Sequence, residues 1–233
     1  LNSQPLGFYT PSQLVQDARR HDVEVRAVDV MRSDWDCTLE EEAAARRKLG
    51  SDPDSAHAFG NQPRPSSESG SDPHFPPSEA SRTQPPVRLG LRLVTGLTEA
   101  AAQRILAARQ QHPFTTTEDL ALRAALDAGD LKALAAADAL TALSGHRRQQ
   151  VWDASALHRA PELLRTAPTH EAALDLPEAG EGEEIVFDYA ATGLTLRRHP
   201  LALLRAQLDR WKLRTSAQLR DLPDGTPTRA CGI

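Results

Sequence analysis

The stretch LRLVTGLTEAAAQRILAAR, residues 91–109, contains two apolar segments separated by a Thr-Gly-Leu turn at 95–97. Glycine in a helix interior costs about 1 kcal/mol relative to alanine, so a continuous helix through this turn is disfavoured. Residues 100–108 are strong helix formers, and Thr98 is placed to cap a helix that has Glu99 in its first turn. The stretch therefore predicts an abrupt turn followed by a helix with an exposed start.

The composition favours small helical modules. Of the 233 residues, 39% are hydrophobic but only 4% are aromatic, which is little for one large core. The net charge is -5, so any contact with nucleic acid requires a local basic patch. Cys37 and Cys231 match no metal or redox spacing, which favours a reduced, cytoplasmic protein. With no apolar run of eighteen residues and no signal peptide, we predict no membrane contact.

Several segments differ in character along the chain. Thr10 and Pro11 predict the start of a helix, and residues 23–28 predict a short extended stretch. Residues 51–86 are crowded with Pro, Ser, Gly and Asp, and they predict a disordered insertion because such a stretch buries too little apolar surface to offset its ordering entropy. The chain does not begin with Met and ends in TRACGI, residues 228–233, which suggests a piece of a longer protein.

The region from residue 87 to about 155 predicts a compact bundle of four or five short helices. Residues 88–150 contain eight Lys and Arg against six Asp and Glu, a net charge of +2 in an otherwise acidic chain. Arg104 and Arg109 lie on the helix after the turn, and Arg147 and Arg148 form a second basic cluster. These clusters are also compatible with an ordinary helix junction and with a solvated helix end, where cations complement the helix dipole.

A tight turn leaves the first amides of the next helix unpaired, where a phosphate oxygen can accept from them. Such a contact carries no sequence information. Together with the two basic clusters, the turn defines a predicted interface with the phosphate backbone of duplex DNA, made of Thr95, Gly96, Leu97, Thr98, Arg104, Arg109, Arg147 and Arg148.

The sequence offers no catalytic or metal site. Asp34 and Asp36 form a close Asp-x-Asp pair, but no glycine-rich phosphate loop or third acid accompanies them, as a nucleotidyl transferase with Mg²⁺ requires. The eight histidines are scattered without zinc-binding spacing. We therefore assign neither catalytic nor metal-binding residues to this segment.

Several ordered stretches resemble bacterial C-family DNA polymerases, in particular the error-prone branch of the replicative alpha subunit. The resemblance begins in the residues 2–9, 14–21 and 23–30 and continues in SDWDCTLE at 33–40. It then includes RLGLRLVTGLTEAAAQRI, PFTTTEDLALRAALD, LKALAAADALTALSGHRRQQVW and DYAATGLTLRRHPLALLR in the same order.

This resemblance implies a mainly α fold. It implies the end of a polymerase fingers region at 1–50, before the insertion at 51–86, and a tandem helix-hairpin-helix domain at 87–155. A linker with amphipathic helices follows at 156–226, and 227–233 begin an OB-fold.

The function implied is damage-induced mutagenesis and translesion synthesis in the bacterial cytoplasm, as part of an SOS-type system. The catalytic aspartates and their Mg²⁺ are expected in a palm region upstream of Leu1. The helix-hairpin-helix region is expected to hold duplex DNA. An accessory mutagenesis protein is the expected partner and would supply an indirect contact with the sliding clamp.

The chain departs from this family at both hairpins and at the insertion. A basic residue is common where Thr95 stands, and a Gly-Ala pair is common where Asp138-Ala139 stands, so both hairpins lose expected phosphate affinity. The insertion replaces a short connection. The clamp-binding peptide of the replicative relatives does not occur between residues 157 and 189, which agrees with the error-prone branch, where an accessory partner is expected to supply that contact. A second hypothesis therefore stays open, in which the bundle is a non-catalytic protein-interaction module that docks the accessory protein.

Overall fold

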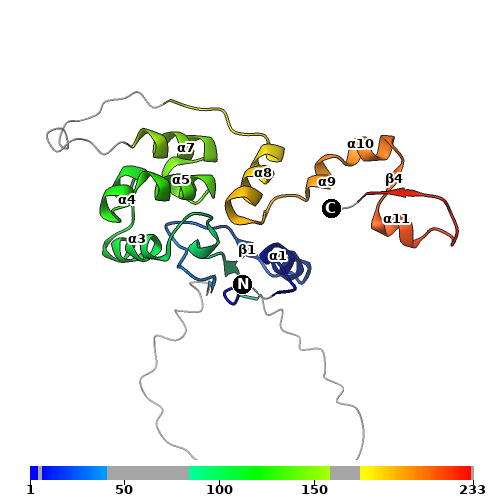
Figure 1. The fold of residues 1–233 in the computed structure, drawn as a ribbon, viewed down its shortest axis with the longest axis horizontal. Coiled ribbons are helices and arrows are strands. Elements are labelled where there is room, and N and C mark those ends of the chain that lie inside the picture. Colours follow the sequence, from blue (N-terminus) through cyan, green and yellow to red (C-terminus); the bar gives the residue numbers. More distant parts are fainter. Residues whose placement is uncertain (5–6, 41–83, 158–173, 232–233) are drawn as a thin grey trace, which may run out of the picture.

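The computed structural model describes residues 1–4, 7–40, 84–157 and 174–231. Of the predicted insertion at 51–86, only residues 84–86 lie within these ranges. The described residues fold mainly into helices, which confirms the predicted fold class (Figure 1). The helices and the one 3-10 turn are α1 (Pro11–Arg20), η1 (Leu91–Leu93), α3 (Glu99–Gln111), α4 (Thr117–Arg123), α5 (Ala128–Ala136), α6 (Thr141–Ser144), α7 (Arg147–Ala156), α8 (Glu181–Thr192), α9 (Pro200–Leu203), α10 (Arg205–Arg210) and α11 (Ser216–Arg220). The strands are β1 (Val25–Arg26), β2 (Thr38–Leu39), β3 (Val87–Arg88), β4 (Leu213–Arg214) and β5 (Arg229–Ala230).

The N-terminal helix α1 begins as its sequence predicts. Thr10 accepts a hydrogen bond from the amide of Gln13, and the Gln13 side chain accepts from the Thr10 amide, which together form a capping box. Pro11 occupies the first helical position, where its missing N–H costs nothing. The start of this helix is therefore determined locally.

A small mixed sheet joins the two ends of the predicted insertion. β3 is its central strand and pairs parallel with β1 and antiparallel with β2. The buried Arg88 donates to Glu40 and to the carbonyl of Ala27. Arg88, with Arg26, lowers the pKa of Glu40. The domain boundary that we predict at residue 87 divides this sheet, and the division of the chain into domains stays a prediction.

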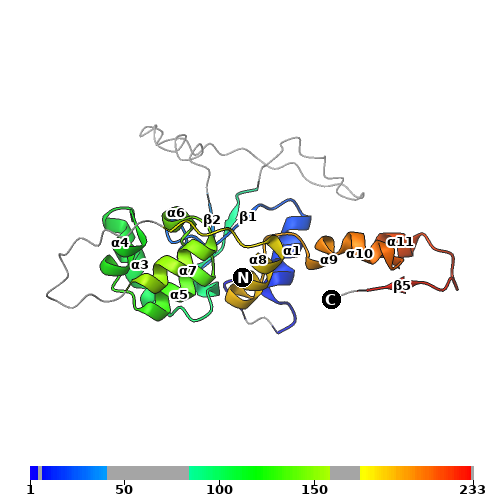
Figure 2. The same ribbon diagram turned by 90° about the horizontal axis from the view of Figure 1, so that it is seen from above.

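The helices α3 to α7 form the bundle that the sequence predicts. α5 lies against α7 in both views (Figures 1 and 2). Thr98, Thr116 and Asp127 cap α3, α4 and α5 with their side-chain oxygens. Leu131, Leu134 and Leu140 are buried in the core of this bundle, and Leu126 and Leu143 pack against that core at its edge.

One hydrophobic core runs through the N-terminal segment, the bundle and the end of α8. Its members include Val15 and Val30 from the first 40 residues, Ile105 from the bundle and Leu194 after α8. None of the core residues lies beyond Leu196, among those described. The last helices, α9 to α11, and the parallel pair β4–β5 extend to one side as a separate lobe, which is orange and red in Figure 1.

The predicted last strand forms as β5, after a turn in which Gly225 has φ +79°. Across the part of the chain that the structure describes, no helix has the length and apolarity needed to cross a membrane.

Candidate nucleic-acid interface

The turn at 95–97 lies between η1 and α3 and is exposed. Gly96 has φ +88°, a left-handed conformation that favours glycine. A Cβ added there would meet nothing closer than the Ala133 Cβ of α5, at 3.9 Å. Leu97 is only 7% exposed and anchors the turn to the core, whereas Thr95, Gly96 and Thr98 are exposed. We call residues 95–98 the first hairpin.

The first hairpin retains unpaired amides at its surface. The Thr95 amide donates to the Ala191 carbonyl at 2.8 Å, and the Leu97 amide donates to Val94. Among the described residues, the amides of Gly96 and Thr98 have no hydrogen-bond partner, and neither do those of the first two residues of α3. Four N–H groups thus lie at a positive helix end, which is the arrangement that accepts a phosphate.

Glu99 is exposed in the first turn of α3. Its carboxylate therefore repels an anion that approaches these free amides. We expect Glu99→Gln to raise the affinity for duplex DNA about twofold to threefold, since a carboxylate beside the free amides repels phosphate. Fluorescence anisotropy with a labelled duplex measures this change. The matched control is Glu118→Gln, which removes an exposed acid from the first turn of α4. An equal gain in both variants would show that only net charge matters.

The second hairpin, residues 137–140 between α5 and α6, is closed by contrast. Its amides all donate within the protein, and that of Leu140 donates to the buried Gln150 side chain at 3.1 Å. Asp138 adopts φ +58°, the left-handed conformation that glycine adopts most readily. The Asp138 carboxylate accepts from Gln150 Nε2 at 2.6 Å. The second hairpin therefore offers no free amide to a phosphate.

The two arginines predicted on α3 both have partners inside the protein. Arg104 donates to the Ala124 carbonyl and contacts Asp130 at 3.2 Å, with 43% of its side chain exposed. Arg109 is 18% exposed and donates to two carbonyls of the 30–33 loop and to Asp34 at 2.7 Å. Arg109 thus fastens the N-terminal segment to the bundle, and only Arg104 retains substantial exposure.

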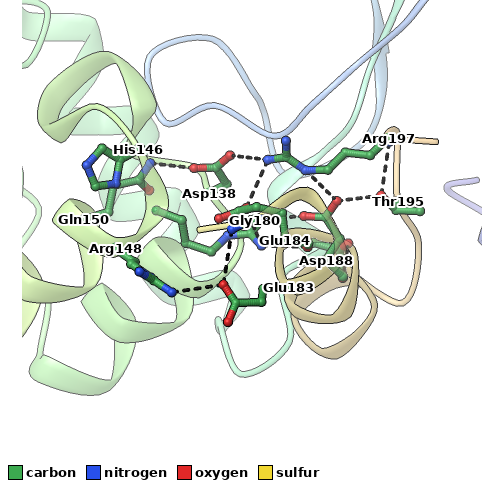
Figure 3. A network of polar contacts seen from close by, with 12 residues as sticks. Asp138, His146, Arg148, Gln150, Gly180, Glu183, Glu184, Asp188, Thr195 and Arg197 are labelled. Atoms are coloured by element: carbon green, nitrogen blue, oxygen red, sulfur yellow. Dashed lines mark hydrogen bonds and ion pairs between the residues drawn. The ribbon is translucent and has the colours of Figure 1, made fainter. Parts of the chain in front are cut away.

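The second basic cluster begins a helix instead of ending one. His146 caps α7, so the hypothesis that this cluster complements a helix C-terminus is wrong. Arg147 is buried and donates to the Glu184 carbonyl and contacts its carboxylate, both at 3.0 Å, and also pairs with Asp188. Arg148 pairs with Glu183 at 3.0 Å (Figure 3).

These contacts belong to a network that joins α8 to the bundle. Arg197 contacts Glu184, Asp188 and the second hairpin's Asp138 at 3.1, 3.4 and 3.5 Å (Figure 3). The role of Arg147 seen here is structural, and DNA contact by any of the eight predicted residues stays a prediction.

Sequence analysis did not single out Lys132. It is exposed on α5 beside Ala133, the nearest neighbour of Gly96 across the hairpin. Among the described residues Lys132 has no ion pair, unlike the four predicted arginines. Its helix α5 packs against the turn through Ala133, a contact that no local sequence pattern identifies.

Comparison with known families agrees with this geometry. A family model described as the helix-hairpin-helix motif matches residues 22–150, more than half of the chain. The chain belongs to the helix-hairpin-helix motif family. The helix-hairpin-helix match begins before α3 and includes the sheet, which shares the bundle's core.

Along its whole length, this chain is also similar to segments of longer proteins. It is 47% identical over 233 residues to the error-prone DNA polymerase of Azoarcus sp. strain BH72, and 46% identical to that of Aromatoleum aromaticum. It is 45% identical to the error-prone DNA polymerase of Methylococcus capsulatus. The chain spans about a fifth of the length of these relatives, 19% to 20%. The resemblance seen in the sequence is confirmed.

Proposed function

We propose that this chain is the DNA-holding part of an error-prone DNA polymerase and that the first hairpin holds the phosphate backbone of duplex DNA. The observation that supports this most is the set of free amides at the exposed Gly96 turn, at the positive end of α3. The exposed Lys132 adds an unpaired cation, among the described residues, on α5, the helix that packs against the turn through Ala133. In this proposal the second hairpin is a structural support, because its amides are satisfied within the protein.

The polymerase activity itself is proposed for the parent protein and not for this segment. The relatives are named error-prone DNA polymerases, and nucleotidyl transfer of that kind needs carboxylates that hold Mg²⁺. Across the described residues, no group of three His, Cys, Asp or Glu side chains is placed to hold a metal ion. We therefore propose that Mg²⁺ is held elsewhere in the parent protein and that translesion synthesis in the bacterial cytoplasm is its role.

The affinity for duplex DNA at two salt concentrations tests the DNA-holding role. A surface that neutralises about two phosphates loses roughly tenfold in affinity between about 50 and 200 mM salt. A salt-independent affinity, or no measurable binding at the lower concentration, would contradict the proposal.

Gly96→Asp tests the first hairpin within that role. Aspartate strains the turn at φ +88° and adds a negative charge beside the free amides. We expect the affinity for duplex DNA to fall by about tenfold, as expected from losing at least one charge-assisted hydrogen bond. Gly96→Ala is the companion variant, because open space surrounds the Cβ and only the strain remains. Unchanged binding by a folded Gly96→Asp protein would remove the hairpin from the mechanism.

A groove between α7 and α8 favours the second hypothesis, docking of an accessory mutagenesis protein. The groove has a volume of about 730 Å³ and is walled mainly by apolar side chains, including Trp152, Phe187 and Val151. Trp152 is 51% exposed. In this case Trp152→Ala would weaken the docking of that protein while leaving the salt-dependent affinity for duplex DNA unchanged.

A further inference from the structure

The last turn of α8 is bonded to the first hairpin. Ala191 lies among the last four residues of α8, so its carbonyl oxygen has no donor within that helix. The oxygen instead accepts from the Thr95 amide at 2.8 Å. α8 lies outside residues 22–150, the range that the helix-hairpin-helix model matches. The first hairpin is therefore held by an element that is not part of the matched motif.

The first hairpin begins with a type II turn at residues 94–97. The Leu97 amide donates to the Val94 carbonyl at 3.2 Å, and Gly96, the third residue of the turn, has φ +88°. The φ of Thr95, the second residue, is not positive, which identifies the type. The turn's own hydrogen bond does not use the Thr95 amide. The hairpin thus has two anchors, the buried Leu97 side chain and the bond from Thr95 to α8.

The end of α8 is itself fixed by contacts to other parts of the protein. Thr195 Oγ1 donates to the Asp188 carboxylate at 2.6 Å, and Arg197 links that carboxylate to the second hairpin (Figure 3). The Leu196 carbonyl accepts a hydrogen bond from α1 at 2.8 Å. We call residues 188–197 the α8 end. Its contacts hold the Ala191 carbonyl at a set place beside the first hairpin.

We propose that the α8 end positions the first hairpin for duplex DNA, with Ala191 and Thr195 as positioning residues that do not touch the DNA. The inference rests on the proposed function of that hairpin. A phosphate binds the free amides of Gly96 and Thr98 more tightly when the hairpin is already ordered, because binding then costs less conformational entropy. The bond from Thr95 also occupies the Ala191 carbonyl, which would otherwise be an unpaired negative helix end that repels phosphate.

Thr95→Pro tests the bond to α8 directly. Proline lacks the N–H but is favoured at the second position of a type II turn, and Val94 before it has the extended backbone that proline requires. The turn should therefore form without its bond to Ala191. We expect the duplex affinity to fall about fivefold, roughly the loss of one hydrogen bond, whereas Thr95→Ala keeps the amide and should lose much less. Equal affinities of the two folded variants would overturn the proposal.

A second pair of variants leaves the residues of the first hairpin unchanged. Thr195→Val removes the hydroxyl that donates to Asp188, and Thr195→Ser keeps it. We expect Thr195→Val to weaken duplex binding about threefold and to speed hydrogen exchange at the Thr95 amide about tenfold in the DNA-free chain, with serine restoring both. The reference is the Leu120 amide, which is bonded at the start of α4 and should exchange at an unchanged rate.

The two measurements separate this inference from the proposed function. Absence of duplex binding by the unmodified chain would overturn the DNA-holding role and this inference with it. If the unmodified chain binds duplex and Thr195→Val binds it equally well, only the positioning role is overturned. Unchanged exchange at Thr95 in Thr195→Val, or a loss of affinity that serine does not restore, would likewise contradict the positioning role alone.

Discussion

Replacing Arg147 by methionine is expected to lower the free energy of unfolding by about 3 kcal/mol, because it leaves two largely buried carboxylates without their main partner. The Arg147 side chain is 4% exposed, and those of Glu184 and Asp188 are 10% and 14% exposed. Arg197 remains in contact with both acids and keeps part of the compensation. Methionine retains much of the packing of the arginine stem. Urea unfolding followed by circular dichroism measures the loss.

Arg148→Met is the matched control for that change. The Arg148 side chain is 41% exposed and pairs with Glu183, which is 57% exposed. An exposed pair of this kind contributes between about 0 and 1 kcal/mol, so this variant should unfold near the unmodified chain. If the two variants lost equal stability, or if Arg147→Met lost none, the network of Figure 3 would not fasten α8 to the bundle.

Gly90→Ala is also expected to lower the free energy of unfolding by about 3 kcal/mol, at the upper end of the effects of overpacking. A Cβ at this position would lie 2.4 Å from both the Trp35 carbonyl oxygen and the Asp36 carbonyl carbon. Those backbone atoms cannot retreat easily, since the amides of Leu91 and Arg92 donate to the carbonyls of Asp34 and Trp35. The two segments cross here with no room for a side chain.

Gly182→Ala provides the opposite control. Gly182 lies in the first turn of α8, and an added Cβ would make an ordinary contact of 3.7 Å with Leu203. Alanine favours helix over glycine by about 1 kcal/mol, so this variant should be as stable as the unmodified chain or more stable. If the Gly90→Ala and Gly182→Ala proteins unfolded at the same urea concentration, the two segments would not cross tightly at Gly90.

The elements that could be predicted from the sequence are those determined by near neighbours. The cap of α1 at Thr10, the cap of α3 at Thr98 and the turn at Gly96 each depend on residues within about four positions of one another. The run VRLGL, residues 87–91, predicts a longer strand than the two residues of β3. Its continuation instead turns into η1, because the backbone of residues 34–35 accepts hydrogen bonds from Leu91 and Arg92.

The candidate site was less accessible to sequence reasoning, because the partners of its arginines lie far away in the chain. Arg109 meets Asp34 across 75 positions, and Arg147 meets Glu184 across 37. A count of charges between residues 88 and 150 includes these arginines but not the acids of α8 that neutralise Arg147 and Arg148. The same count does not show that Lys132, unlike these arginines, has no ion pair among the described residues.

The amides of the first hairpin can report directly on the proposed contact. In a ¹⁵N-labelled chain titrated with a short DNA duplex, the amide signals of Gly96 and Thr98 and those at the start of α3 are expected to shift most, since a phosphate would accept from them. The signals of Asp138 and Ala139 in the second hairpin should stay in place, because their amides already donate within the protein. Large shifts at the second hairpin or along the α7–α8 groove, with Gly96 and Thr98 unmoved at saturating duplex, would contradict the account.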